Sequence, residues 1–179
     1  MKHTFQRGVT LVELLLGLAV IAVVLGIVML LWDHTNADAS AYKTRTGFDA
    51  ILTGVKALYL QPQYANITTT AMIASNKIPQ SMVSNANEIV APWGAQIHIS
   101  PSALGGPAGS AFDITFDAVP AAQCSPLVQH GGPQVMRVVI GTTIVKDMSA
   151  DPAIPDPPPD TVVQTCLGSG GQAIVFTST

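Results

Sequence analysis

Apolar residues dominate the first part of the chain and then give way to periodic patterns. Residues 14–32 contain no charged side chain, and Glu13 is the acid that precedes them. An apolar run of this length is long enough to cross a bilayer as a helix, which takes about 20 residues. Because no proline occurs between Val9 and Gln61, the sequence predicts one helix of about 50 residues that continues beyond the apolar run.

The distal half of this predicted helix, residues 33–61, is amphipathic. Its apolar residues recur at the i, i+3, i+4 and i+7 spacing that places them on one helical face. This spacing predicts a buried stripe that packs against a sheet, and Gln61 and Pro62 should end the helix. The stripe consists of Phe48, Ile51, Leu52, Val55, Leu58 and Tyr59.

Residues 62–179 carry short strand patterns between segments rich in glycine and proline. We expect an irregular connection up to residue 87, with one short helix for which Thr68 to Thr70 offer an N-cap. Beyond it, period-two alternation and turn residues predict a series of short strands. The strands are expected at 88–91, 95–100, 112–117, 135–140, 142–145 and 173–176, and short helices at 120–130 and after a capping Asp160.

Together these patterns predict an α+β fold, in which the distal half of the long helix packs on an antiparallel sheet. The alternation is clearest at 112–117, where Asp113 and Asp117 should face outward, as should His98 on the preceding strand. Residues 151–160 contain five prolines and should form an extended surface loop.

The composition favours a protein that packs against other molecules and gives no sign of nucleic-acid binding. Charged residues make up 11% of the chain, against about 25% in an average protein. A weakly charged surface suits a subunit that packs against copies of itself. The net charge is −3, and no basic patch is present, so direct nucleic-acid binding is not expected.

The charges that flank the apolar run predict its orientation. Lys2 and Arg7 precede it, whereas Asp33 and Asp38 follow it, which places the N-terminus in the cytoplasm by the positive-inside rule. The C-terminal part is then exported to an oxidising compartment. Its two cysteines, at 124 and 166, therefore favour a disulfide, with two buried thiols as the alternative.

Residues 8–13, Gly-Val-Thr-Leu-Val-Glu, resemble the type IV prepilin signature. In that family a membrane peptidase cuts after the glycine and N-methylates the new terminus. The resemblance implies that residues 1–8 are a leader ending at Gly8, that Val9 is the methylated terminus, and that Glu13 pairs with the terminal amine of a neighbouring subunit. It also implies a helix at 9–32 that crosses the membrane and later forms the filament core. Opposite charges that are costly alone in lipid become tolerable as a pair.

A second resemblance concerns the turn at residues 91–95. Ala-Pro-Trp-Gly-Ala followed by a strand resembles the turn of type IVb major pilins, the thin-pilus and bundle-forming kind. This resemblance implies that the C-terminal strand lies within the sheet and that residues 124–166 form a disulfide-bounded region of the head, residues 62–179. A tight turn with a packed tryptophan is the simpler interpretation of the same residues.

The resemblance implies a structural subunit of an extracellular pilus that serves adhesion, aggregation or mating contact. Its expected partners are copies of itself, the prepilin peptidase, membrane lipid before assembly, the inner-membrane assembly machinery and an outer-membrane secretin. The head would lie in the periplasm before assembly and outside the cell afterwards. A secretion pseudopilin, a minor pilin and a secreted binding domain with an ordinary signal peptide are the alternatives.

The sequence gives no indication of an enzyme, a cofactor or a metal site. The four histidines, at 3, 34, 98 and 130, are scattered, and no two of them lie four residues apart as paired zinc ligands on a helix do. No phosphate-binding glycine motif follows a predicted strand, so we interpret the glycine-rich stretches at 104–109 and 168–171 as ordinary loops. Asp113 and Asp117 could contact calcium, but a solvated strand face is the simpler interpretation.

Overall fold

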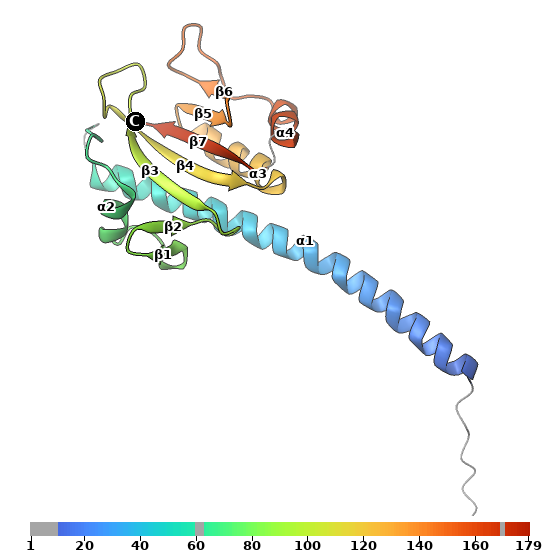
Figure 1. Cartoon of the computed structure of the whole chain (residues 1–179). Coiled ribbons are helices and arrows are strands. Elements are labelled where there is room, and N and C mark those ends of the chain that lie inside the picture. The colour runs from blue at the N-terminus through green and yellow to red at the C-terminus, as the bar shows by residue number, and fades with distance from the viewer. Residues whose placement is uncertain (1–10, 60–62, 169–170) are drawn as a thin grey trace, which may run out of the picture. The chain divides into compact units, whose positions relative to one another are not determined.

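The computed structural model describes residues 11–59, 63–168 and 171–179, and gives the backbone alone for residues 30–38 (Figure 1). The chain divides into two compact units, Met1–Asp38 and Ala39–Thr179. Helix α1, Leu11–Leu58, contributes to both of them. The long helix predicted from the absence of proline is therefore confirmed over the described residues.

The helix ends three residues before the predicted position, at Leu58. Tyr59 is no longer helical, although its N–H still donates to the carbonyl of Val55 at 3.0 Å. The predicted stripe is buried from Phe48 to Val55 but not at Leu58, which is 41% exposed in the last turn. The prediction of burial is thus wrong for the end of the stripe, while Tyr59 is half-buried and its ring lies 5.7 Å from that of Tyr64.

A seven-stranded antiparallel sheet forms the body of the unit Ala39–Thr179. Its order is β1-β2-β3-β4-β7-β5-β6, so the C-terminal strand pairs with both β4 and β5 (Figure 1). The implied insertion of the last strand within the sheet is confirmed. The strands are β1 (Val83–Asn85), β2 (Glu88–Val90), β3 (Gln96–Ser102), β4 (Ala111–Val119), β5 (Arg137–Ile140), β6 (Thr143–Asp147) and β7 (Gln172–Ser178).

The connection before the sheet contains more regular structure than the sequence predicts. The expected helix is present as α2, Thr69–Ala74, and the Thr68 hydroxyl accepts a hydrogen bond from the N–H of Ala71 at 3.1 Å. A 3-10 turn, η1 (Gln80–Met82), and strand β1 follow within the segment expected to be irregular. Strand β1 was missed because three residues are too short to show alternation.

Two helices, α3 (Ala121–Gly131) and α4 (Pro159–Leu167), carry the cysteines. A disulfide joins Cys124 to Cys166, as predicted. The predicted cap of α4 is wrong: the N-cap position is Pro158, without a side-chain cap, and Asp160 lies in the first turn. Proline at the first helical position starts the helix because its φ angle is already helical.

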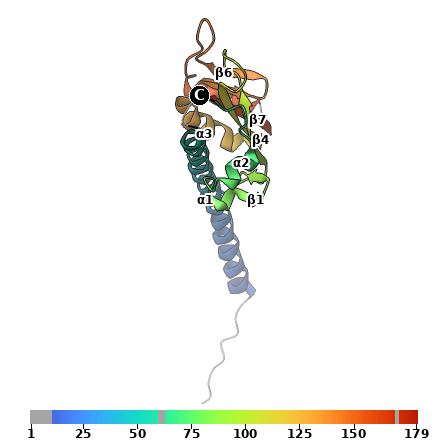
Figure 2. The same ribbon diagram turned by 90° about the vertical axis from the view of Figure 1, so that its left-hand side faces the viewer.

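The core lies between the sheet and the helices, which Figures 1 and 2 show on one side of it. Phe48 of α1 contacts Phe176 of β7 and Phe116 of β4, with ring centroids 4.9 Å and 6.2 Å away. Gly131, at the end of α3, lies against this cluster: a Cβ at that position would be 2.8 Å from the Phe176 ring and 3.0 Å from that of Phe48. Gly131 therefore allows α3 to approach the aromatic core closely.

Gly131→Ala should lower the free energy of unfolding by about 1–3 kcal/mol, because its methyl group would overpack two buried rings. Gly132→Ala is the matched control, since a Cβ there meets nothing closer than 3.7 Å. We expect the control to keep the parental stability in denaturant titrations of the detergent-solubilised chain. Equal stability of both variants would contradict this packing.

Candidate functional site

The first described part of α1, Leu11–Met29, is apolar on every side. Its mean hydropathy is 2.9, and by length and composition it can cross a membrane. All of its fourteen large apolar side chains are exposed, from 47% at Val28 to 76% at Leu11. A contiguous apolar surface of this extent indicates that the segment contacts lipid or other protein.

Glu13 is the acidic residue of this segment and lies in the first turn of the described helix. A carboxylate near a helix N-terminus is favoured by the helix dipole. The sequence also predicts cleavage between Gly8 and Val9 and methylation of Val9. These two residues lie outside the described residues, so both statements stay predictions.

The head half of α1 is joined to α3 by polar contacts beside the aromatic core. Asp49 Oδ1 lies 2.8 Å from His130 Nε2, and Gln134 Nε2 donates to the same oxygen at 3.1 Å. The His130 ring meets Phe48 edge-on, with centroids 6.3 Å apart. These contacts fix the register of α3 along the helix.

The loop between β6 and α4, residues 148–158, contains most of the prolines of the 151–160 segment, and we call it the proline-rich loop. A buried lysine attaches it to the body. Lys146 is 4% exposed, donates from Nζ to the carbonyl of Gly132 at 2.8 Å, and lies 2.8 Å from Asp156 Oδ1. The backbones of Ile154 and Asp147 form a β-bridge, in which each N–H donates to the carbonyl of the other residue, with N···O distances of 2.8 and 2.9 Å. The residues of the loop are otherwise mostly exposed, as predicted.

Asp147, at the base of this loop, has a pKa below its ordinary value of 3.8. The main cause is the Ser149 hydroxyl, which donates to Asp147 Oδ1 at 2.6 Å, and the Ser149 N–H and Arg137 add to it. Arg137 Nε lies 3.4 Å from the other carboxylate oxygen. These groups hold the charged carboxylate in place at the loop base.

The turn at residues 91–95 is closed by two backbone hydrogen bonds. The N–H of Ala91 donates to the carbonyl of Ala95 at 2.8 Å, and the N–H of Gly94 donates to the carbonyl of Ala91 at 2.8 Å. Gly94 has φ of +87°, which favours glycine. Trp93 packs against Phe116 and donates from Nε1 to the carbonyl of Asp117 at 3.1 Å. The simpler interpretation, a tight turn with a packed tryptophan, describes what this segment does in the fold.

A groove of about 410 Å³ opens beside this turn. It lies where α1, η1 and β2 meet, and Gly47 makes this approach possible because a Cβ there would overlap the Met82 sulfur. Sequence reasoning missed the groove, since three segments distant in sequence form it. Its walls include Tyr42, Lys43 and Thr46 of α1 together with Pro79, Met82 and Pro92.

The outward-facing acids of β4, Asp113 and Asp117, alternate with buried residues along the strand. Asp117 lies 3.0 Å from His98 across β3 and β4. In the part of the chain that the structure describes, no group of three or more histidine, cysteine, aspartate or glutamate residues could hold a metal ion. Asp113 and Asp117 thus have the places on the strand face that the alternation predicts.

Comparisons with known proteins decide the family. A protein-family model described as "PilS N terminal" matches residues 38–179, and one described as "Prokaryotic N-terminal methylation motif" matches residues 4–29. The chain belongs to the PilS family of type IV pilins. The methylation motif spans Gly8, Val9 and Glu13. No curated protein is similar enough to this chain to count as a match.

Solved structures show the same fold. The chain is similar to TcpA, a type IV pilin from Vibrio cholerae El Tor biotype, with a TM-score of 0.61 and 16% identity over 79% of this chain and 99% of that one. It is also similar to a type IV b pilin from Salmonella typhi, with a TM-score of 0.55 and 17% identity over 74% of this chain and 95% of that one. The type IV pilin fold is therefore established for this PilS-family chain.

Asp147→Asn should destabilise the head at neutral pH and make it less sensitive to acid. Because folding lowers the pKa of Asp147, its contribution is full above the unfolded value and is lost as the pH falls through the folded value. The melting temperature of the variant should lie below that of the parent at pH 7, and the difference should shrink below about pH 4. The exposed Asp151→Asn is the control, and a difference independent of pH would contradict the assignment.

Proposed function

We propose that this chain is the major subunit of a type IVb pilus, polymerised into an extracellular filament for adhesion, aggregation or mating contact. The observation that carries this proposal is the apolar surface of Leu11–Met29, exposed on every side in the single chain. Such a surface is covered first by lipid and then by the same helices of other copies. The family and the fold support a structural role rather than an enzymatic one.

The apolar segment enters the membrane in spite of its acid. Burying each large apolar side chain is worth about 1.5–3 kcal/mol, and the segment has fourteen of them. One carboxylate costs about 3 kcal/mol at the bilayer centre and less near its edge. Insertion is therefore favourable overall, and pairing with a positively charged group would lower the cost of placing Glu13 in lipid.

The amine of a neighbouring Val9, exposed by cleavage after Gly8, is the partner we propose for Glu13. A carboxylate and an ammonium group in a low-dielectric core attract each other strongly, and each is penalised when it is unpaired. The pair would thus define the stagger between successive helices. Apolar packing supplies the cohesion of the filament, whereas this ion pair supplies its register.

This function determines where the chain acts and what it meets. The prepilin would stand in the inner membrane with residues 1–8 in the cytoplasm and the head in the periplasm. The prepilin peptidase would cut and methylate it there. The inner-membrane assembly machinery would then extract it into a filament that leaves through an outer-membrane secretin. The disulfide between Cys124 and Cys166 suits a head that works outside the cytoplasm.

Glu13→Val should permit cleavage but abolish filaments, because it removes the partner of the terminal amine. Mass spectrometry of the mature N-terminus should find methylated Val9 in both variant and parent, while sheared surface filaments should be absent from the variant alone. Val12→Ala, in the same turn, is the matched control and should assemble. Normal filaments from Glu13→Val cells would contradict the proposal.

The same measurements separate the alternatives. Methylated Val9 in abundant surface filaments supports a major pilin. The methylated chain confined to the cell envelope would instead indicate a pseudopilin or a minor pilin. An N-terminus near Ser40 would indicate a secreted domain with an ordinary signal peptide.

A further inference from the structure

We propose that the groove beside Pro92 receives the tip of the proline-rich loop, Asp151 and Pro152, of a second copy of this chain. The proposal rests on the proposed function, because it assigns a head-to-head contact within the filament. It concerns the unit Ala39–Thr179 alone.

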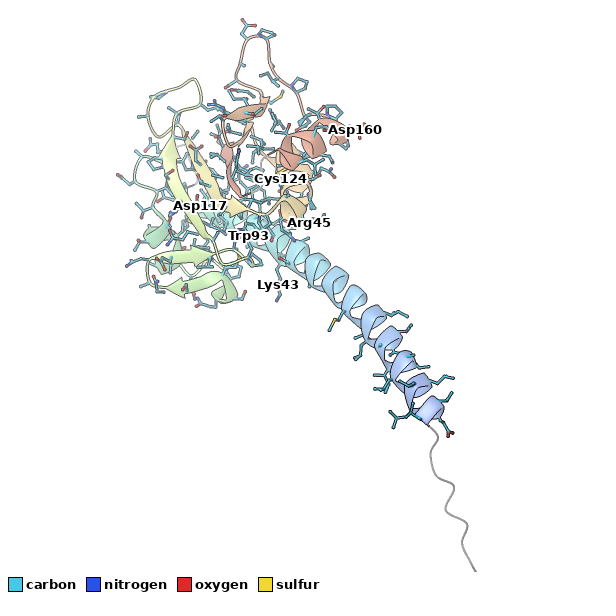
Figure 3. All side chains as sticks on the ribbon, turned by 45° about the vertical axis from the view of Figure 1, so that its right-hand side comes forward. Lys43, Arg45, Trp93, Asp117, Cys124 and Asp160 are labelled. Atoms are coloured by element: carbon cyan, nitrogen blue, oxygen red, sulfur yellow. A yellow bond between two sulfur atoms is a disulfide. The ribbon has the colours of Figure 1, made fainter. Side chains whose placement is uncertain are left out.

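Among the described residues, the groove offers the cation of Lys43, the aromatic ring of Tyr42 and the edges of Pro79 and Pro92. Tyr42 is 72% exposed, and Lys43 beside it forms no ion pair among the described residues. Lys43 and Arg45 project from opposite sides of α1 (Figure 3), and Lys43, unlike Arg45, lines the groove. None of the described residues that line it is acidic. Its volume of about 410 Å³ is enough for a few side chains of a bound segment.

The proline-rich loop offers the complementary chemistry. Residues 151–160 contain five prolines, three aspartates and no basic residue. Asp156 is held by Lys146, whereas Asp151 and Pro152 at the tip are exposed. Because Lys146 and the Ile154 bridge already fix the base of the loop, docking of the tip orders little additional chain and costs little entropy.

Apolar contact and charge both favour this pairing. The exposed ring of Tyr42 and the edge of Pro92 offer an apolar surface to the exposed Pro152. The charge of Asp151 complements that of Lys43, and in a chain of negative net charge an exposed lysine is a selective partner for an acidic tip.

The positions of the two sites make the contact one between copies. Figures 1 and 2 show the loop after β6 at one end of the unit, whereas β1 and β2, which adjoin the groove, lie at the other. The loop of one chain therefore cannot reach its own groove. A contact between two different surfaces leaves a free groove on one copy and a free loop on the other, so it can repeat from copy to copy. Such a head-to-tail contact generates a filament when its rotation does not close a ring, and it is therefore compatible with the proposed pilus.

Engineered cysteines at the edges of the two sites test the contact while leaving Lys43 and Asp151 in place. Thr46 lines the groove, Ala153 follows the tip, and both native cysteines are buried in the disulfide. Filaments of Thr46→Cys/Ala153→Cys should be converted by mild oxidation from monomer into a ladder of multimers on non-reducing gels. Each single variant should stay monomeric.

The matched control is Thr53→Cys/Ala153→Cys, because Thr53 lies on the same helical face about 10 Å from Thr46, beyond the reach of a disulfide. It should give no ladder. Intact filaments of Thr46→Cys/Ala153→Cys without a ladder, or a product with a different protein, would overturn the contact. Parental cells without filaments of this chain would instead contradict the proposed function.

Charge reversal provides the second arm, which applies even where the cysteine pair does not assemble. Lys43→Glu and Asp151→Lys should each lower the mass of sheared filaments at least about tenfold, and the double variant should restore it, since the reversed charges again attract. Each chain should still be present at the parental level in the membrane. Parental filament yield in both single variants, or no recovery in the double, would overturn the proposal.

Discussion

An apolar helix surface that the single chain leaves uncovered is the constraint on which the rest of the structure depends. The side chains of Leu11–Met29 are exposed along the whole segment, and such an apolar surface is unfavourable in water. We infer that lipid covers this surface before assembly and that the same segments of other copies cover it afterwards. Apolar packing alone would allow the helices of the proposed filament many registers. The ion pair between Glu13 and a neighbouring amine would favour one of them, because burying a carboxylate without a partner costs free energy.

The head is built so that the second half of the same helix serves as a core element. Phe48 fixes α1 to β4 and β7, Gly131 lets α3 approach the same rings, and Asp49 with His130 adds a polar contact at that place. The disulfide joins α4 to α3, and together with Lys146 it attaches the proline-rich loop to the body. One end of the head thus presents an anchored acidic loop, and the other presents a groove with an available lysine.

The sequence predicted the features that have local causes. The absence of proline predicted the long helix, its spacing predicted the burial of Phe48, and alternation predicted the face of β4 that carries Asp113. The place of β7 within the sheet came from the resemblance alone, because pairing between distant strands leaves no local pattern. Lys146 is buried because a bulge between Val138 and Val139 shifts the register of the β5–β6 hairpin. The alternation of apolar and polar residues in the sequence does not predict such a shift. The groove was missed for a related reason, since it exists only once α1, η1 and β2 meet.

Cryo-electron microscopy of sheared filaments tests the central claim most directly, because it shows what covers the apolar segment. The account predicts that the helices of neighbouring copies pack together along Leu11–Met29 in the filament core, with the terminal amine of Val9 of one copy within ion-pair distance of Glu13 of another. Filaments in which this segment faces solvent, or in which Glu13 lies away from every terminal amine, would contradict it.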